Sequence, residues 1–166
     1  MPKSLKYALY MSVASIALSL ILFALGLDKE QALGMLGIVF TVLFLYLGIK
    51  DKKETEGNGF LTFGEGFKRG AAITVIASII NSVFTYIYLS MINLELKDFQ
   101  MEKEYDKMIE RGMSEDQIDM SMNMMDKYFA FFGIGGALVG GIIIGLVISL
   151  IISAILKKEN PDAMSA

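Results

Sequence analysis

An uninterrupted apolar stretch from Tyr128 to Leu156 constrains the fold of this chain more than any other feature. Its only ionisable side chain is the Tyr128 phenol, and an α-helix needs about 20 apolar residues to cross the hydrocarbon core of a bilayer. Small residues recur at every fourth position along it: Gly133, Ala137, Gly141, Gly145, Ser149 and Ser153. Because such a row lets another helix approach closely, we predict a closely packed membrane span over residues 130–156.

Three further apolar blocks have the length of membrane spans: residues 7–27, 32–49 and 70–92. Apolar residues make up 54% of the 166 residues, above the roughly 45–50% of soluble domains, and the excess lies in these blocks. The first block, with a candidate cleavage site at Gly26, also resembles a signal peptide, but it exceeds the usual apolar length of about 7–15 residues. We therefore predict an all-α membrane protein, a single integral membrane domain over residues 1–166 with four transmembrane helices in a bundle.

The segment between spans three and four, residues 93–127, has the pattern of a helical hairpin. An amphipathic helix is expected over Leu94–Arg111, and Gly112 ends it. Ser114 starts a capping box for a second helix that runs towards the fourth span. A similar capping box at Thr62 predicts that the third span's helix begins near Phe63. The tail after Pro161 is expected to be disordered.

The distribution of Lys and Arg predicts the orientation of the spans, because cytoplasmic segments of membrane proteins are enriched in these residues. With both termini inside, the cytoplasmic segments hold the following basic residues: Lys3, Lys6, Lys50, Lys52, Lys53, Lys68, Arg69, Lys157 and Lys158. The remaining basic residues are diluted by acidic ones, most of them in residues 93–127. We therefore predict that both termini lie inside and that residues 93–127 lie outside the cytoplasm.

Composition excludes several classes of function. The chain has no Cys and no His, so it has no thiolate nucleophile, no imidazole base and no ligand set typical of zinc. A net charge of −3 argues against nucleic acid as a partner. We therefore expect a protein that is not an enzyme, has no catalytic residues, binds no metal and holds no cofactor.

Two loop motifs resemble a known bacterial membrane family. They are GFLTFGEGFKRG over Gly59–Gly70 and RGMSEDQIDMSM over Arg111–Met122. Both are similar to the family designated domain of unknown function 4199, found mainly in Bacteroidota, and the similarity extends over nearly the whole chain. The resemblance implies a multi-pass protein of the bacterial inner membrane. It supplies no activity or site residues, since none is established for the family.

Two sets of residues are candidates for a structural or binding role. The helix-packing set is Gly133, Ala137, Gly141, Gly145 and Asn81. We expect packing within the monomer for most of the small-residue rows and self-association for the remainder. The second set, which contacts a lipid phosphate or only sets the topology, is Lys68, Arg69, Lys157 and Lys158, part of an inner basic patch that also includes Lys50, Lys52 and Lys53.

These features favour a scaffold or accessory subunit of an envelope complex, with the bilayer and another membrane protein or a second copy as partners. A transporter or flippase for a lipid-linked substrate is the alternative, and a groove between spans three and four that ends at Lys68 or Arg69 would favour it. The third hypothesis is extracytoplasmic Cu(I) binding, because thioethers suit Cu(I). It rests on the methionine cluster Met120, Met122, Met124 and Met125.

Overall fold

The chain folds into helices, and the computed structural model describes residues 1–160. The helices are α1 (Lys3–Ala24), α2 (Gln31–Gly34), α3 (Leu36–Thr55), α4 (Phe63–Ile87), the π-helix η1 (Tyr88–Ile92), α5 (Leu94–Glu110) and α6 (Glu115–Leu156). Four segments are long and apolar enough to cross a membrane: Lys3–Ala24, Ala32–Thr55, Phe63–Ile92 and Glu115–Leu156. The prediction of an all-α protein with four candidate spans is confirmed. The tail expected to be disordered after Pro161 lies outside the described residues.

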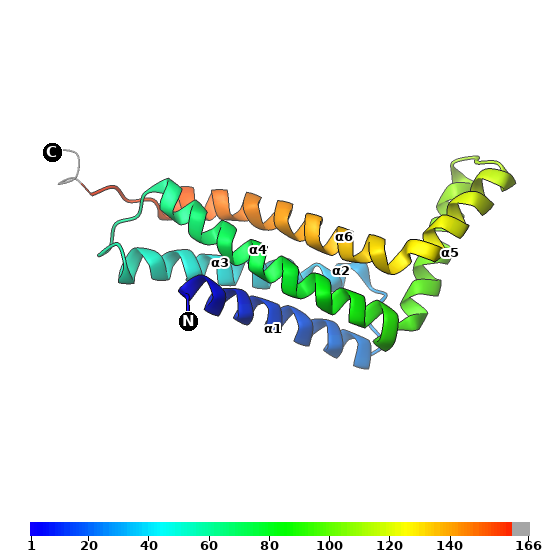
Figure 1. Cartoon of the computed structure of the whole chain (residues 1–166), viewed down its shortest axis with the longest axis horizontal. Helices are drawn as coiled ribbons and strands as arrows, with labels where there is room; N and C mark the ends of the chain where they lie inside the picture. The colour runs from blue at the N-terminus through cyan, green and yellow to red at the C-terminus, as the bar shows by residue number, and fades with distance from the viewer. Residues whose placement is uncertain (161–166) are drawn as a thin grey trace.

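The four long helices lie side by side in a bundle (Figure 1). Both α3 and α4 contact each of the other three long helices. We call the end of the bundle that carries the α3–α4 loop, the start of α1 and the end of α6 the terminal end. The buried apolar core lies between the long helices and includes one loop residue. It comprises Ala8, Met11, Leu45, Ile49, Leu61, Ile73, Ala77 and Ile152.

At the opposite end, α5 and the first part of α6 project from the bundle (Figure 1). We call residues 94–128 the arm. Tyr128 has non-helical backbone angles, φ −113° and ψ 15°, so α6 bends where the arm meets the bundle. Lys97 of α5 pairs with Asp126 of α6 at 2.6 Å, which ties the two arm helices together. The expected continuation of the second arm helix into the fourth span therefore occurs, but through a kink.

The helix boundaries differ from the expected ones mainly at the second span. A short first turn, α2, is interrupted at Met35, and α3 continues past the expected end at Ile49 to Thr55. The hydropathy pattern predicts that the span ends at the first charged residues. The helix itself continues beyond that point because oppositely charged side chains pair four residues apart. Lys50 pairs with Glu54 at 3.6 Å, and Lys52 pairs with Glu56 at 3.1 Å.

The expected start of the third span's helix is confirmed. Thr62 is the N-cap, and its hydroxyl oxygen accepts a hydrogen bond from the Glu65 backbone N–H at 3.3 Å. The Glu65 carboxylate accepts in return from the Thr62 backbone N–H at 3.0 Å. This reciprocal pair satisfies two donors that would otherwise be unpaired at the helix start.

Candidate functional site

The closest helix contact in the bundle lies between α4 and α6, and both helices contribute small residues to it. On α4 the row is Gly66, Gly70, Thr74 and Ser78, and on α6 the facing row is Ser153, Ser149, Gly145 and Gly141. We call these eight residues the α4–α6 seam. Residues four positions further along α4 contact residues four positions earlier on α6. The helices are therefore antiparallel and in register along the whole row.

The space at the seam's glycines shows how close the two helices are. A β-carbon added to Gly145 would lie 2.4 Å from Thr74 Cγ2, and one added to Gly70 would lie 2.5 Å from Ser149 Oγ. At Gly141 and Gly66 the nearest atoms, Ser78 Oγ and Ser153 Oγ, would each be 2.9 Å away. All four distances are too short for a real β-carbon. A β-carbon at any of these positions would force the facing side chain or the helix to move, so the seam depends on packing of glycine backbone against small side chains.

The other predicted packing residues lie in different surroundings. A β-carbon on Gly133 would lie 2.6 Å from Leu89 Cδ1, so this glycine packs against η1. Ala137 is partly buried on the same row of α6. Asn81 is partly buried on α4, and its side chain forms no hydrogen bond within residues 1–160, so it does not cross-link helices there.

Hydroxyl groups near the seam bond mainly to their own helices. Ser149 Oγ donates to the Gly145 carbonyl at 2.7 Å, and Ser82 Oγ donates to the Ile79 carbonyl at 2.8 Å. Thr74 Oγ1 and Ser153 Oγ are buried and have no partner in the described chain. These residues therefore allow the helices to pack closely because their side chains are small, and their hydroxyl groups do not link the two helices by hydrogen bonds.

The four predicted phosphate-contacting residues lie at the terminal end but do not form one cluster. Arg69 pairs with Glu56, and only 9% of its side chain is exposed. Lys157 pairs with Glu159 at 3.0 Å, and the Lys158 ammonium lies 5.3 Å from the centre of the Phe60 ring. Lys68 is exposed and forms no ion pair with another residue in the described part of the chain.

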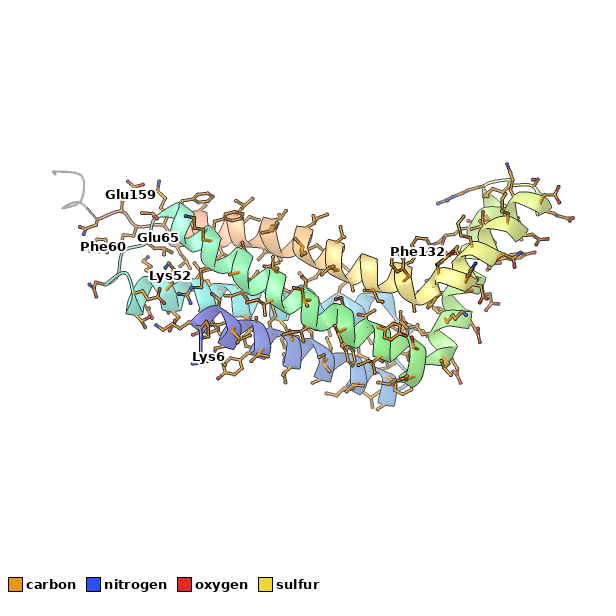
Figure 2. All side chains as sticks on the ribbon, viewed as in Figure 1. Lys6, Lys52, Phe60, Glu65, Phe132 and Glu159 are labelled. Atoms are coloured by element: carbon orange, nitrogen blue, oxygen red, sulfur yellow. The ribbon has the colours of Figure 1, made fainter. Side chains whose placement is uncertain are left out.

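Sequence reasoning missed the ion network in which Arg69 takes part. Glu56, at the end of α3, accepts from Arg69 of α4 and from Lys52, and Lys3 of α1 lies 3.7 Å from it. One carboxylate therefore links three helices at the terminal end. The hydrogen bond from Arg69, followed by that from Lys52, lowers the pKa of Glu56 from 4.5 to about 2. Figure 2 labels Lys52 in this region, with Phe60 and Glu65 nearby.

The lowered pKa predicts how this network responds to acid. Because the folded-state pKa lies below the unfolded value, the Glu56 carboxylate stabilises the bundle fully above about pH 4.5 and progressively less towards pH 2. Glu56→Gln is expected to lower the melting temperature at neutral pH by about 2–4 °C, and the difference from wild type should shrink in acid. Thermal unfolding in detergent between neutral pH and pH 3 measures this. Glu54→Gln, which alters only the pair with Lys50, is the control, and an equal effect there would contradict the prediction.

A short backbone bridge closes the terminal end. The Leu61 N–H donates to the Lys158 carbonyl at 2.8 Å, and the Lys158 N–H donates back to the Leu61 carbonyl at 2.9 Å. Leu61 itself is 2% exposed and belongs to the core. The bridge therefore holds the segment after α6 against the α3–α4 loop.

A second polar cluster, also missed from the sequence, lies where the arm joins the bundle. Asn93 is 2% exposed and caps α5, because its side-chain oxygen accepts from the Leu96 N–H at 3.0 Å. Its amide donates to Asp28 in the α1–α2 turn at 2.6 Å and to the Tyr88 hydroxyl at 2.9 Å. One buried amide thus connects three segments. The only sequence signal was an Asn that precedes a helix. This signal does not predict the hydrogen bond to Asp28, which lies 65 positions earlier in the chain.

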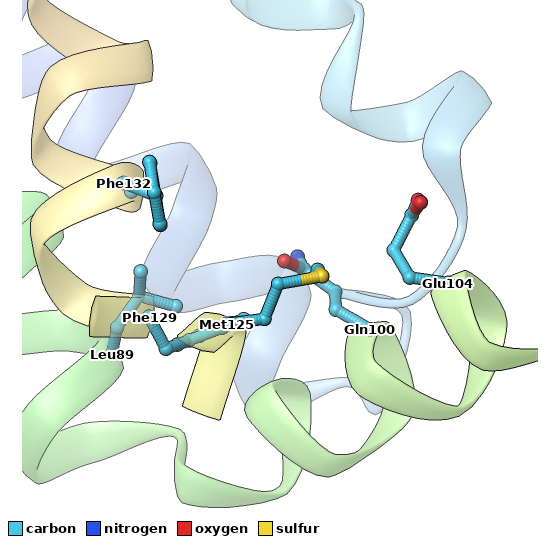
Figure 3. Close-up of a pocket in the computed structure, with 7 residues that line it drawn as sticks. Leu89, Gln100, Glu104, Met125, Phe129 and Phe132 are labelled. Atoms are coloured by element: carbon cyan, nitrogen blue, oxygen red, sulfur yellow. The ribbon is translucent and has the colours of Figure 1, made fainter. Parts of the chain in front are cut away.

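A pocket of about 430 Å³ opens between the arm helices and η1. Its apolar lining comes from α6 and η1, and α5 supplies the two polar residues. The lining is Leu89, Gln100, Glu104, Met125, Phe129, Phe132 and Gly133. Figure 3 shows the Met125 side chain pointing across the pocket towards Gln100. Met125 therefore lies on the inner side of the arm, whereas Met120 and Met124 of the predicted methionine cluster are exposed.

The fold defines this chain as a helical-bundle membrane protein with a projecting arm. A family model described as protein of unknown function (DUF4199) matches residues 6–158, and the chain belongs to that family. The resemblance noted from the two loop motifs is thereby confirmed. No curated protein and no solved structure matches the chain.

Proposed function

We propose that this protein is a scaffold or accessory subunit of an envelope complex, without enzymatic activity, and that its arm binds another membrane protein. The carrying observation is a stripe of exposed apolar side chains along α6. Met120, Met124, Tyr128 and Phe131 are 66, 53, 44 and 70% exposed. Their spacing of four and four residues places Met120, Met124 and Tyr128 on one face of the arm part of α6, and Phe131 follows three residues beyond the kink.

The position of this stripe supports a partner that is itself in the membrane. It begins on the arm, among acidic residues, and passes the kink at Tyr128 into the apolar part of α6. Exposed apolar patches on a polar segment are typical of protein–protein contacts, and methionine side chains adapt to varied partner surfaces. A partner that crosses the bilayer beside α6 would cover the stripe on both sides of the membrane surface.

The placement of basic residues supports an inner-membrane protein with both termini in the cytoplasm and the arm outside. Lys3, Lys52 and Arg69 belong to the network at the terminal end; this end holds nine of the 15 Lys and Arg residues, whereas the longer arm segment holds five. This asymmetry is the one that sets topology in inner-membrane proteins. Cysteine labelling from the outside of intact cells, at Asn123→Cys on the arm and Gly64→Cys at the terminal end, tests the orientation. Labelling of Gly64→Cys alone would reverse it.

The close contact of α4 with α6 favours the scaffold over the flippase alternative. That alternative needed a groove between these two spans, and at each of the four seam glycines an added β-carbon would lie less than 3.0 Å from the facing helix. For Cu(I) binding, Met125 lies in the pocket while Met120 and Met124 are exposed on the arm. Copper binding stays a hypothesis, which a Cu(I) titration of the purified chain tests.

The partner-binding role predicts the effect of substitutions on the stripe. Met120→Glu with Met124→Glu is expected to reduce the recovery of the co-purified membrane partner at least tenfold in mild detergent, because carboxylates cannot be buried unpaired at the contact. Met120→Leu with Met124→Leu keeps the apolar surface and is expected to retain the partner. Melting temperatures of both variants should match wild type. If wild type purifies alone, or if both double variants retain the partner equally, the proposal fails.

A further inference from the structure

The face of the bundle between α3 and α6 carries a groove of about 640 Å³ that has no polar lining. α3 contributes one wall and α6 the other. The lining is Ile38, Val39, Val42, Leu43, Tyr46, Ile148, Ile151, Ile152 and Ile155. Most of these side chains are β-branched and so have few rotamers. The groove is therefore largely preformed, and an occupant would cost little side-chain entropy.

Two lysines continue the groove's α3 face towards the terminal end. Lys50 and Lys53 follow Tyr46 by four and seven residues, so all three lie on one side of the helix. Lys50 pairs with Glu54 at 3.6 Å, and 43% of the Lys50 side chain remains exposed. Lys53 forms no ion pair with any residue of the described chain. Positive charge is therefore available where the groove meets the edge of the membrane span.

The dimensions of the groove match one layer of a bilayer. The rise from Ile38 to Tyr46 along α3 is about 12 Å, and the rise from Ile38 to Lys50 is about 18 Å. One leaflet of the hydrocarbon core is about 15 Å thick, half of the roughly 30 Å total. A hydrocarbon tail in the groove would therefore end in the middle of the bilayer when its headgroup lies beside Lys50 and Lys53.

We infer that the groove binds one acyl chain of an anionic glycerophospholipid whose phosphate contacts Lys50 and Lys53. The apolar walls would take the chain, and the Tyr46 hydroxyl would lie near the glycerol ester region. The two ammonium groups provide the preference for negative charge. The phosphate contacts proposed here lie on α3, whereas the four basic residues singled out from the sequence lie on α4 and just after the end of α6. The groove site is independent of the partner-binding role of the arm, which lies at the other end of the bundle.

Native mass spectrometry of the purified full chain tests the inference, with phosphatidylglycerol and phosphatidylcholine offered in equal amounts. Wild type is expected to retain phosphatidylglycerol preferentially. Lys50→Gln with Lys53→Gln should lower this preference about tenfold, because each lysine contributes to anion attraction near a membrane surface. Val42→Trp should reduce retention of both lipids, because the indole fills the groove.

Matched variants separate this site from general effects. Lys6→Gln with Lys103→Gln removes two exposed lysines that do not continue the groove, one at the terminal end and one on the arm, and Val75→Trp enlarges a side chain of α4 that does not line it. Both should behave as wild type. An equal loss in these controls, or unchanged preference in the Lys50 and Lys53 double variant, overturns the inference. If Val42→Trp instead abolishes a dimer, the groove holds a second copy of the chain and no lipid.

Discussion

Gly145→Leu is expected to separate α4 from α6 and to lower the free energy of unfolding by about 3 kcal/mol or more. The nearest atoms to an added β-carbon are Thr74 Cγ2 at 2.4 Å and Thr74 Oγ1 at 2.6 Å, and the Thr74 β-carbon follows at 3.0 Å. Gly145 and Thr74 are both buried, so neither has an exposed side into which it can move. The helices must therefore move apart, which breaks the packing at neighbouring positions along the seam.

Gly140→Leu is the matched control for this prediction. It lies on the same helix five residues away, and nothing lies within 4 Å of its added β-carbon. Its free energy of unfolding is expected to stay within about 0.5 kcal/mol of wild type. Gly145→Ala with Thr74→Gly restores the local volume and should recover much of what Gly145→Ala alone loses. Denaturant unfolding in detergent measures all four variants, and equal destabilisation by Gly140→Leu would contradict the seam.

Asn93→Ala is expected to have the second largest effect, a loss of about 3 kcal/mol and a loosened arm. The change removes the cap of α5, worth about 1 kcal/mol, and the donor to the Asp28 carboxylate at 2.6 Å, whose charged hydrogen bond is worth about 1.5–3 kcal/mol. The Tyr88 hydroxyl loses its contact as well. Because this buried amide joins the three segments, beside the more exposed Lys29–Glu95 ion pair, hydrogen exchange in α5 should accelerate along with the loss of stability.

An exchange of partners tests the specific geometry at Asn93. Asn93→Asp alone places a second carboxylate beside Asp28 and should destabilise the protein. Adding Asp28→Asn reverses the donor and acceptor across the same 2.6 Å contact and should restore most of the stability. Asn123→Ala, at an exposed arm position, should be neutral. If the double exchange is no more stable than Asn93→Asp alone, the hydrogen bond does not join the arm to the bundle.

The helices and their caps follow from local sequence. Four apolar blocks predict four candidate spans because span length is a local property of hydropathy. The capping box at Thr62 predicts the start of α4 because the two residues involved are three positions apart. The kink at Tyr128 and the π-helix η1 have no comparable signal in the sequence; both occur where the arm joins the bundle.

The candidate site also combines features that the sequence predicts with features that only the structure shows. The small-residue row of α6 is visible in the sequence, but its partner on α4 is known only from the structure, because register between two helices depends on both surfaces. The charge of Arg69 is likewise plain, while its use in an ion pair with Glu56 depends on where α3 ends.

Local patterns along the chain thus predict a helical protein with four candidate membrane spans, and they identify the helix faces whose side chains are small enough for close contact. The tertiary structure decided which faces meet, which charges pair, and that a groove lies between α3 and α6. The physical reason is range: hydropathy and capping act within a few residues, whereas packing, ion pairs and grooves require segments that are distant along the chain.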